Sequence, residues 1–399
     1  MSKQKKKIDL RAVFADPKAK KTALFAALGF LAVLVTVLLI VIGVRGKTNA
    51  PVDAAGESSA AVSAQARTGQ GNSRGGFPLS FSGENVLDVK NGGSGLYVLT
   101  KDTVYFVSTS GAFSTPLNHT YVEPVIKTGG NYVLLYDRVT GKFQLGDERK
   151  LLFSGQSENG QQITTVAVTK QGDFLVAAKG VNYASLLTYY SKNGDILFSW
   201  ECAKEYIVSV SVAKNRKDLL CAAVSSRNGE MYTKLYQLNV KATETVWETH
   251  LPGTAVTECA FGAGSDVIAL CGDRRLVVNT KKEEDAVERA DYPAAALLCH
   301  SDGKGCTAVV NQKLGSFDMY EITVYDKNNK PVLQSETAER PVSVFCCGKK
   351  AFILTDSGVF RVRKNGKLRE KCKLSETERG LVMVGSDAFH YSKNTLYKN

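Results

Sequence analysis

The sequence predicts an all-β protein: an eight-bladed β-propeller preceded by one transmembrane α-helix. From Phe77 onward, short apolar runs alternate with turns rich in Gly, Asn, Asp and Lys, with hardly any helical period. One such unit recurs at intervals of 36–48 residues, the size of a four-stranded propeller blade. A single long apolar segment, residues 22–44, precedes these repeats.

The repeated unit is an alternating strand, a turn and a nearly all-apolar strand. The alternating strands, such as ITTVAVT from Ile163 and IVSVSVA from Ile207, suit the innermost position around a central channel, where space is tight. The apolar strands are LYVLT from Leu96, YVLLY from Tyr132, FLVAA from Phe174, LLCAA from Leu219, VIALC from Val267, CTAVV from Cys306, AFILT from Ala351 and AFHYS from Ala388.

The end of the chain indicates how the ring closes. The last repeat supplies only three strands, whereas FPLSF at 77–81 has no partner within its own repeat. We expect FPLSF to form the outer strand of the last blade, which removes the edges that an open sheet would expose. A seven-bladed ring and a pair of β-sandwiches are the alternatives. Asn-Gly at 193–194 and 365–366 predicts hairpins between third and outer strands.

Residues 22–44 contain 23 residues without a charge. As a helix they span about 34 Å, enough to cross a hydrocarbon core of about 30 Å. Eight cations and two acids precede them in residues 1–21, so the positive-inside rule predicts a cytoplasmic N-terminus in the cell membrane and an extracytoplasmic C-terminal domain. A cleavable signal peptide is the alternative, although its apolar core would be only about 7–15 residues. Ala23 and Ala27 form a small-xxx-small pair that could pair two helices.

The predicted order is therefore a basic tail (1–21), a transmembrane helix (22–44), a flexible linker (45–76) and a propeller (77–399). The linker is rich in Ala, Ser, Gly and Gln, and as a coil it would span about 30 Å. Half of the net charge of +12 falls in the tail. The remainder is spread over the rest of the chain, which does not indicate nucleic-acid binding.

The residues that could carry chemistry show no catalytic or metal-binding pattern. All nine cysteines follow residue 200, mostly in apolar runs and without C-x-x-C spacing, which favours buried thiols over disulfides or zinc. The histidines fall in different repeats: His119, His250, His300 and His390. No motif of a hydrolase, P-loop or EF-hand occurs. We therefore predict no enzyme, no cofactor and no metal site.

Two resemblances follow from these residues. The layout from the Lys-rich tail to the repeats after FPLSF resembles a family of uncharacterised single-pass membrane proteins of Gram-positive bacteria, which have an extracytoplasmic propeller of unknown function. The segments 190–200 and 236–247 are similar to PQQ-type propeller repeats, found in quinoprotein dehydrogenases and in a non-catalytic outer-membrane assembly scaffold. That resemblance implies that Trp200 and Trp247 dock neighbouring blades. The turn glycine, Gly194, is present only in the first segment.

Cys346-Cys347 is the pair that most suggests chemistry, because quinoprotein dehydrogenases carry a vicinal disulfide beside their cofactor. Adjacent cysteines in a regular strand point to opposite faces, so they cannot bridge without leaving β geometry. With Trp200 and Trp247 assigned to blade edges, an aromatic platform for a quinone is also unsupported. Two separate buried thiols are the simpler interpretation.

The sequence favours a non-catalytic interaction or scaffold module of the cell envelope, which binds another envelope protein. A propeller that binds a wall polysaccharide or small ligand is the alternative, and a quinoprotein-like oxidoreductase is the third. A ligand site would need exposed aromatic residues with polar neighbours, for which Tyr183, Tyr189 and Tyr190 are candidates unless they serve strand packing. Arg274-Arg275 and Lys349-Lys350 are basic pairs that could meet anionic wall polymers, and the run KKEEDAVERAD at 281–291 is most simply an outer strand and loop. The oligomeric state is not predicted.

Overall fold

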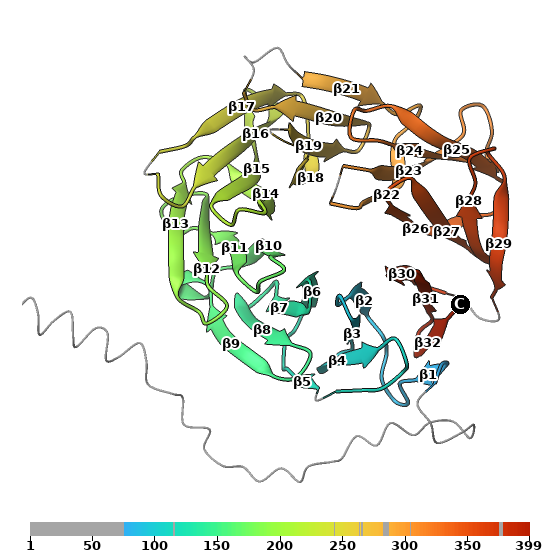
Figure 1. The fold of residues 1–399 in the computed structure, drawn as a ribbon. Coiled ribbons are helices and arrows are strands. Elements are labelled where there is room, and N and C mark those ends of the chain that lie inside the picture. Colours follow the sequence, from blue (N-terminus) through green and yellow to red (C-terminus); the bar gives the residue numbers. More distant parts are fainter. Residues whose placement is uncertain are drawn as a thin grey trace, which may run out of the picture. The chain divides into compact units, whose positions relative to one another are not determined.

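Eight four-stranded antiparallel sheets form a closed ring in the computed structural model (Figure 1). The eight-bladed propeller is confirmed, and the seven-bladed and sandwich alternatives are excluded. The structure describes residues 76–114, 116–242, 244–262, 264, 266–281, 287–303, 305–374 and 378–399. The predicted tail, the predicted span and all but the last residue of the predicted linker lie outside these ranges. Within them, no helix has the length and apolarity to cross a membrane.

The first four blades follow the chain from the innermost to the outermost strand. Blade 1 contains β2 (Asp88–Asn91), β3 (Gly95–Leu99), β4 (Thr103–Ser108) and β5 (Leu117–Asn118). Blade 2 contains β6 (Pro124–Gly129), β7 (Tyr132–Asp137), β8 (Lys142–Asp147) and β9 (Leu151–Gln156), followed by the 3₁₀ turn η1 (Glu158–Gly160). Blade 3 contains β10 (Ile163–Val168), β11 (Phe174–Lys179), β12 (Ser185–Tyr190) and β13 (Ile196–Cys202). Blade 4 contains β14 (Tyr206–Val212), β15 (Asp218–Arg227), β16 (Glu230–Asn239) and β17 (Trp247–Pro252).

The remaining blades keep this order, except that the outermost strand of the last blade is β1, from the start of the domain. Blade 5 contains β18 (Val256–Phe261), β19 (Asp266–Cys271), β20 (Arg274–Asn279) and β21 (Val287–Asp291). Blade 6 contains β22 (Ala296–Ser301), β23 (Thr307–Gln312), β24 (Tyr320–Tyr325) and β25 (Pro331–Thr337). Blade 7 contains β26 (Pro341–Cys347), β27 (Lys350–Thr355), β28 (Gly358–Val362) and β29 (Leu368–Lys373). Blade 8 contains β30 (Gly380–Val384), β31 (Asp387–Tyr391), β32 (Thr395–Lys398) and β1 (Leu79–Ser80).

The hydrophobic core lies between blades. The second strand of each blade is buried on both faces, which explains the nearly unbroken apolar runs in the sequence. One cluster, for example, joins Leu175 and Leu187 of blade 3 to Leu219 and Tyr236 of blade 4. The ring of Trp200 on β13 lies 5.1 Å from that of Tyr236, centroid to centroid. Trp247 packs in the same way against the cluster between blades 4 and 5. Both tryptophans therefore dock neighbouring blades, as the PQQ-type resemblance implies.

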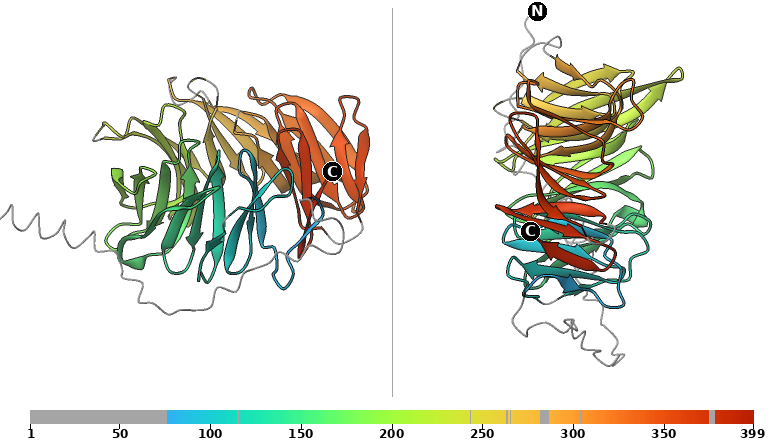
Figure 2. Two further views of the ribbon diagram at one scale, coloured as in Figure 1. Left: turned by 60° about the horizontal axis from the view of Figure 1, so that its bottom comes forward. Right: turned by 90° about the vertical axis from the view of Figure 1, so that its right-hand side faces the viewer.

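The ring has two distinct faces. Within each blade the strands are antiparallel, and the chain passes from the outermost strand of one blade to the innermost strand of the next. We name the face that carries these passages, together with the turns between second and third strands, the connection face. The opposite face carries the turns between first and second strands and between third and fourth strands, and we name it the turn face. Figure 2 shows the ring from the side, with strands running between the two faces.

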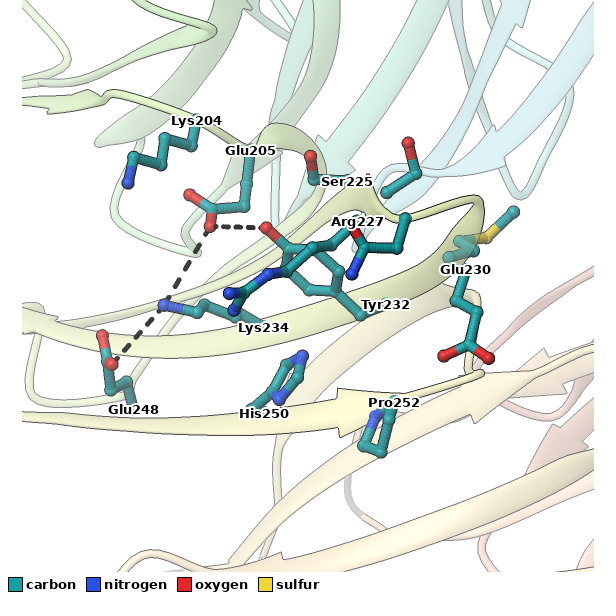
Figure 3. A pocket seen from close by; sticks show the side chains of 13 residues that line it. Lys204, Glu205, Ser225, Arg227, Glu230, Tyr232, Lys234, Glu248, His250 and Pro252 are labelled. Atoms are coloured by element: carbon teal, nitrogen blue, oxygen red, sulfur yellow. Dashed lines mark hydrogen bonds and ion pairs between the residues drawn. The ribbon is translucent and has the colours of Figure 1, made fainter.

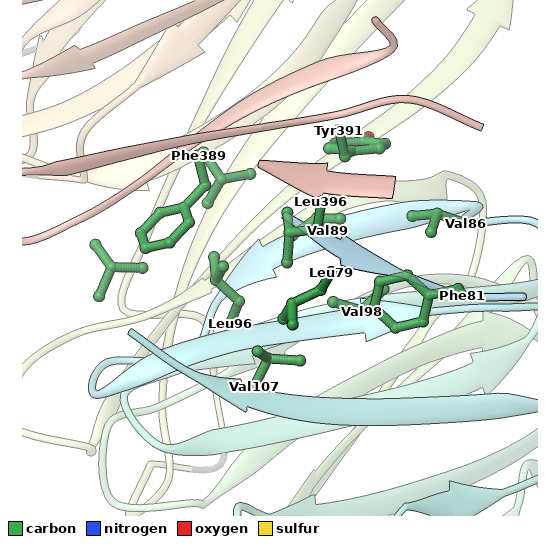
Figure 4. Packing of buried hydrophobic residues seen from close by; sticks show 12 residues of the cluster. Leu79, Phe81, Val86, Val89, Leu96, Val98, Val107, Phe389, Tyr391 and Leu396 are labelled. Carbon is green, nitrogen blue, oxygen red and sulfur yellow. The ribbon is translucent and has the colours of Figure 1, made fainter. Parts of the chain in front are cut away.

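The ring closes through the predicted strand FPLSF. β1 pairs with β32 in antiparallel register, Leu79 opposite Leu396 and Ser80 opposite Thr395. Phe81 then donates its N–H to the Asn394 carbonyl at 2.8 Å. Around this pairing the first and last blades share one apolar cluster, in which Leu79 and Phe81 are buried (Figure 4). The predicted closure is confirmed.

His300 on β22 lies in the interface between blades 6 and 7. Its Nδ1 accepts the backbone N–H of Cys346 at 3.2 Å, and its ring lies on Phe345 with centroids 4.1 Å apart. Desolvation by burial lowers the pKa of His300 to about 4, and nearby Lys90 acts in the same direction. Asp302 opposes this shift. A proton on Nδ1 would also displace the Cys346 hydrogen bond, so the neutral ring belongs to the folded state.

Removal of the Phe81 side chain at the ring closure should lower the free energy of unfolding far more than removal of an exposed phenylalanine. We predict that Phe81→Ala lowers the free energy of unfolding by about 3–5 kcal/mol, because it leaves a cavity at the ring closure. Phe317 is 91 % exposed, and Phe317→Ala, the matched control, should change it by about 0.5 kcal/mol or less. Denaturant titration measures both; equal effects would contradict the closure.

Acidification should weaken the interface between blades 6 and 7. The pKa of His300 is lower in the folded state than its ordinary 6.5, so the unfolded chain binds the proton first and stability falls as pH drops from 6.5 towards 4. The loss should be on the order of 3 kcal/mol. His300→Asn retains a hydrogen-bond acceptor without titrating, and its unfolding free energy should fall less steeply over this pH range. Identical slopes for both proteins would contradict the assignment.

Candidate functional site

One hairpin extends beyond the rest of the ring. β15 and β16 pair over ten residues, from Asp218 opposite Asn239 to Arg227 opposite Glu230, whereas the second strands of the other blades have five or six residues. Asn228 (φ 54°) and Gly229 (φ 83°) form the two-residue turn at its tip. Positive φ at both positions is typical of a type I′ turn, for which Asn-Gly is the preferred pair. Asn228-Gly229, one of five Asn-Gly pairs in the sequence, was the available signal for this hairpin and was not among the predicted turns.

A pocket of about 840 Å³ lies beside this hairpin on the connection face. Figure 3 shows side chains from three elements around it: the passage from β13 to β14, the hairpin itself and β17. Its volume falls in the range of small-molecule sites. The pocket is lined by Lys204, Glu205, Ser225, Ser226, Arg227, Asn228, Glu230, Met231, Tyr232, Lys234, Glu248, His250 and Pro252.

A buried carboxylate anchors the floor of the pocket. Glu205 is 5 % exposed, and its Oε1 accepts the Tyr232 hydroxyl at 3.1 Å and lies 4.0 Å from the Lys234 Nζ. Lys234 also lies 3.6 Å from Glu248 Oε1 and over the ring of Tyr236. A buried charge is costly unless it is paired and hydrogen-bonded. These partners therefore fix the orientation of Tyr232 and Lys234.

The wall of the pocket combines aromatic and charged groups. The Tyr232 and His250 rings meet edge to face, with centroids 4.8 Å apart. The thiol of Cys202 lies 3.5 Å from Glu205, and burial raises the pKa of this thiol to about 11. A thiol with that pKa is protonated at neutral pH and is a poor nucleophile. The pocket thus offers aromatic faces, cations and acids to a ligand.

Exposed apolar side chains gather on the connection face. Phe317 and Leu314 lie in the β23–β24 turn, 91 % and 69 % exposed, and Met231 on the extended hairpin is 51 % exposed. The same face carries Leu87, Val122, Val139, Val181 and Tyr206 as exposed apolar residues. Most of the large exposed apolar side chains in the described ranges therefore share one face with the pocket. Within this face, Leu314 and Phe317 are close neighbours in one turn, which makes that turn a candidate contact site.

The central channel holds charged groups from several blades. Glu258 on β18 is reached by solvent, yet the surrounding inner strands partly desolvate its carboxyl group, which raises its pKa. Lys127 of β6, from a different blade, acts in the opposite direction. Among the described residues, no group of three or more His, Cys, Asp or Glu could hold a metal ion.

The tyrosines suggested as ligand-binding residues do not line the pocket. Tyr189 is buried in the cluster between blades 3 and 4, and Tyr190 stacks on Phe174 with ring centroids 5.0 Å apart. Tyr183 donates its hydroxyl to Glu158 on the connection face. Strand packing therefore accounts for Tyr189 and Tyr190. The aromatic residues at the pocket are Tyr232 and His250 instead.

The four histidines are dispersed over the ring. His119 follows β5, His250 lies on β17, His300 on β22 and His390 on β31, so they belong to blades 1, 4, 6 and 8. Both Cys346 and Cys347 are free thiols, but the prediction of two buried thiols is wrong for Cys347, which is exposed while Cys346 is buried. They lie on opposite faces of β26, as expected of a regular strand.

The prediction of an exposed basic loop at Arg274-Arg275 is wrong for Arg275. This side chain is fully buried on β20. It donates to the Gly305 carbonyl at 2.8 Å, to Thr307 Oγ1 at 3.2 Å and to Asn329 Oδ1, and so links blade 5 to blade 6. Alternation along a strand places neighbouring cations on opposite faces. Arg274 pairs with Asp273, whereas Lys349 and Lys350 are exposed as predicted.

Comparison with known proteins supports the fold and the family. Sqt1 of Saccharomyces cerevisiae is 10 % identical with a TM-score of 0.59, the alignment covering 82 % of this chain and 99 % of Sqt1. The C-terminal WD40 domain of Sif2 is 10 % identical with a TM-score of 0.58, covering 81 % and 98 %. BamB from Moraxella catarrhalis is 11 % identical with a TM-score of 0.50, covering 81 % and 100 %. At these identities the likeness shows the fold alone.

A search of curated proteins finds no match. A protein-family model does match, over residues 80–393, which is most of the propeller. The chain therefore belongs to the family of unknown function DUF5711.

Proposed function

We propose that this protein is a membrane-anchored, non-catalytic, extracytoplasmic module that binds another protein of the cell envelope through its connection face. The observation that carries this proposal is the excess of exposed apolar side chains on that face, among them Phe317, Leu314 and Met231. Interfaces are enriched in aromatic residues and Met, and Phe317, Tyr206 and Met231 are of these types.

The fold suits such a role. A closed ring holds its loops on a rigid disk, so a partner meets a preformed surface with little ordering cost. The anchor is proposed from the uncharged segment 22–44 and the cations before it. Anchoring confines the propeller near the membrane and raises its effective concentration for a partner in the same membrane.

The proposed absence of catalysis is supported by two buried groups, the carboxylate of Glu205 and the neighbouring thiol of Cys202. Glu205 is tied to Tyr232 and Lys234, and Cys202 is held protonated by burial. General acid–base or nucleophilic catalysis needs a group free to exchange protons with a substrate. Neither Glu205 nor Cys202 meets that condition.

A second candidate function is binding of a wall saccharide or small polar ligand in this pocket. The observation that favours it is the Tyr232–His250 pair, which offers aromatic faces beside Lys204, Arg227 and Glu248. Stabilisation by glycans or small ligands in thermal-shift assays, lost in Tyr232→Ala, would support this function.

Charges placed on the connection face should abolish partner capture. We crosslink the tagged full-length protein in its own membrane and identify co-purifying proteins by mass spectrometry. Met231→Glu combined with Phe317→Glu should reduce the dominant envelope partner by about tenfold or more, because the interface would have to bury charges. Replacing segment 22–44 with an unrelated span should leave capture unchanged.

Ile196→Glu is the matched control, since Ile196 is 65 % exposed at the start of β13 on the turn face. The Ile196→Glu variant should capture as much of the envelope partner as the unmodified protein does. If no partner co-purifies reproducibly, or if Ile196→Glu loses as much partner as the double variant, the protein is not an interaction module of the kind proposed. Loss of capture when only the span is exchanged would place the interaction in the membrane segment instead.

A further inference from the structure

The two faces of the propeller differ in charge. On the turn face, the turns between third and fourth strands carry exposed lysines: Lys192 in blade 3, Lys327 and Lys330 in blade 6, and Lys364 and Lys367 in blade 7. The turns between first and second strands add Lys170, Lys214, Lys217 and Lys349, all exposed. These nine lysines belong to blades 3, 4, 6 and 7 and give the turn face an excess of exposed cations.

The acids of the turn face do not balance these cations at the surface. Two of these acids hydrogen-bond to their own turns, which orients them but leaves their charge: Asp147 accepts the N–H groups of Arg149 and Lys150 at 2.8 and 2.9 Å, and Asp326 accepts those of Asn328 and Lys330. The buried Asp173 pairs with Arg216. Asp195 and Glu244 are exposed acids of this face, and the sequence adds three acids and one lysine in segment 282–286. The surface remains predominantly positive.

The connection face lacks this bias. Exposed cations there, such as Lys101, Arg138 and Lys393, alternate with exposed acids, such as Asp102 and Glu123. Solubility alone would not require that one face hold the excess of lysines, because mixed charges serve that purpose equally well. The polarity of the disk therefore points to a polyanion that meets the turn face.

The chain also enters the propeller at the turn face. β1 is the outermost strand of blade 8, and strands in that position run from the turn face to the connection face. The first described residue, Gly76, lies against Gly111 in the β4–β5 turn, where a Cβ added to Gly111 would lie 3.0 Å from the Gly76 nitrogen. Lys398 donates to the Thr109 carbonyl at 2.9 Å in that same turn. The 75 residues before Gly76, with the apolar segment 22–44, therefore attach on the basic side.

We infer that the turn face lies against an anionic lipid surface, with its lysines on the phosphate headgroups, while the connection face points away towards its partner. This inference rests on the proposed membrane anchorage. Surface cations within a Debye length of anionic headgroups are attracted to them. The place where the chain enters favours lipid over a soluble polymer, because the linker leaves from this face and lets it reach the bilayer without passing round the disk.

Lysine labelling of the reconstituted full-length protein tests the inference. The chain is placed in neutral phosphatidylcholine vesicles and in vesicles containing phosphatidylglycerol, labelled with a membrane-impermeant amine reagent and mapped by mass spectrometry. Labelling of Lys192, Lys330, Lys364 and Lys367 should fall about fivefold in the anionic vesicles and recover in high salt. Labelling of Lys101 and Lys393 should not change. Equal labelling of both faces would overturn the inference.

Charge-reversal variants on each face test whether binding to anionic vesicles depends on the turn face or only on the net charge of the protein. Lys364→Glu with Lys367→Glu should restore labelling of Lys192 and Lys330 in anionic vesicles, whereas Lys101→Glu with Lys393→Glu should not. Protection by a soluble glycerol-phosphate polymer but not by anionic vesicles would overturn the inference in favour of a wall polymer. Alkaline extraction of the vesicles tests separately whether the protein is anchored in the membrane. Release of the chain would reject the anchor, while the labelling pattern of vesicle-bound protein would still decide the face.

Discussion

The pairing of β1 with β32 is the constraint on which the rest of the structure depends. Two opposed residue pairs and the hydrogen bond from Phe81 to Asn394 join the first segment of the domain to the last blade. Without this strand, blade 8 would expose an unpaired edge, and the cluster between blades 8 and 1 would lose Leu79 and Phe81. Because each blade buries its second strand against both neighbours, closure completes the core of the first and last blades. The direction of β1 also fixes the face at which the chain enters.

The two faces acquire different properties from the same repeat. In the β24–β25 and β28–β29 turns of the turn face, Asp326 and Asn365 hydrogen-bond to the local backbone, while lysines of such turns, for example Lys192 and Lys364, face the solvent. The connection face carries the extended β15–β16 hairpin and the apolar β23–β24 turn. A tethered disk with one basic and one apolar face can meet an anionic surface and a protein partner at the same time. The proposed membrane contact of the turn face and the proposed partner contact of the connection face are therefore compatible.

The parts of the fold that could be predicted are those that repeat. Unbroken apolar strands, such as the one from Tyr132, and an unpaired first strand at 77–81 follow directly from burial on both faces and from edge protection. The pocket could not be predicted, because Glu205 and Tyr232 meet only when the passage between two blades folds beside a longer hairpin. Arg275 was misread because charge in sequence does not reveal which face of a strand a side chain occupies. Tyr189 was an ambiguous candidate for the same reason.

The most direct test of this account is the register of the closing strand. Ser80→Cys with Thr395→Cys places two thiols on directly opposed residues, at the Cα separation that a disulfide accepts. Mild oxidation followed by peptide mapping should find this crosslink and a raised unfolding midpoint. Ser80→Cys with Tyr397→Cys, two residues out of register, should not crosslink. Crosslinking of the second pair, or of neither, would contradict the closed ring and the point at which the chain enters it.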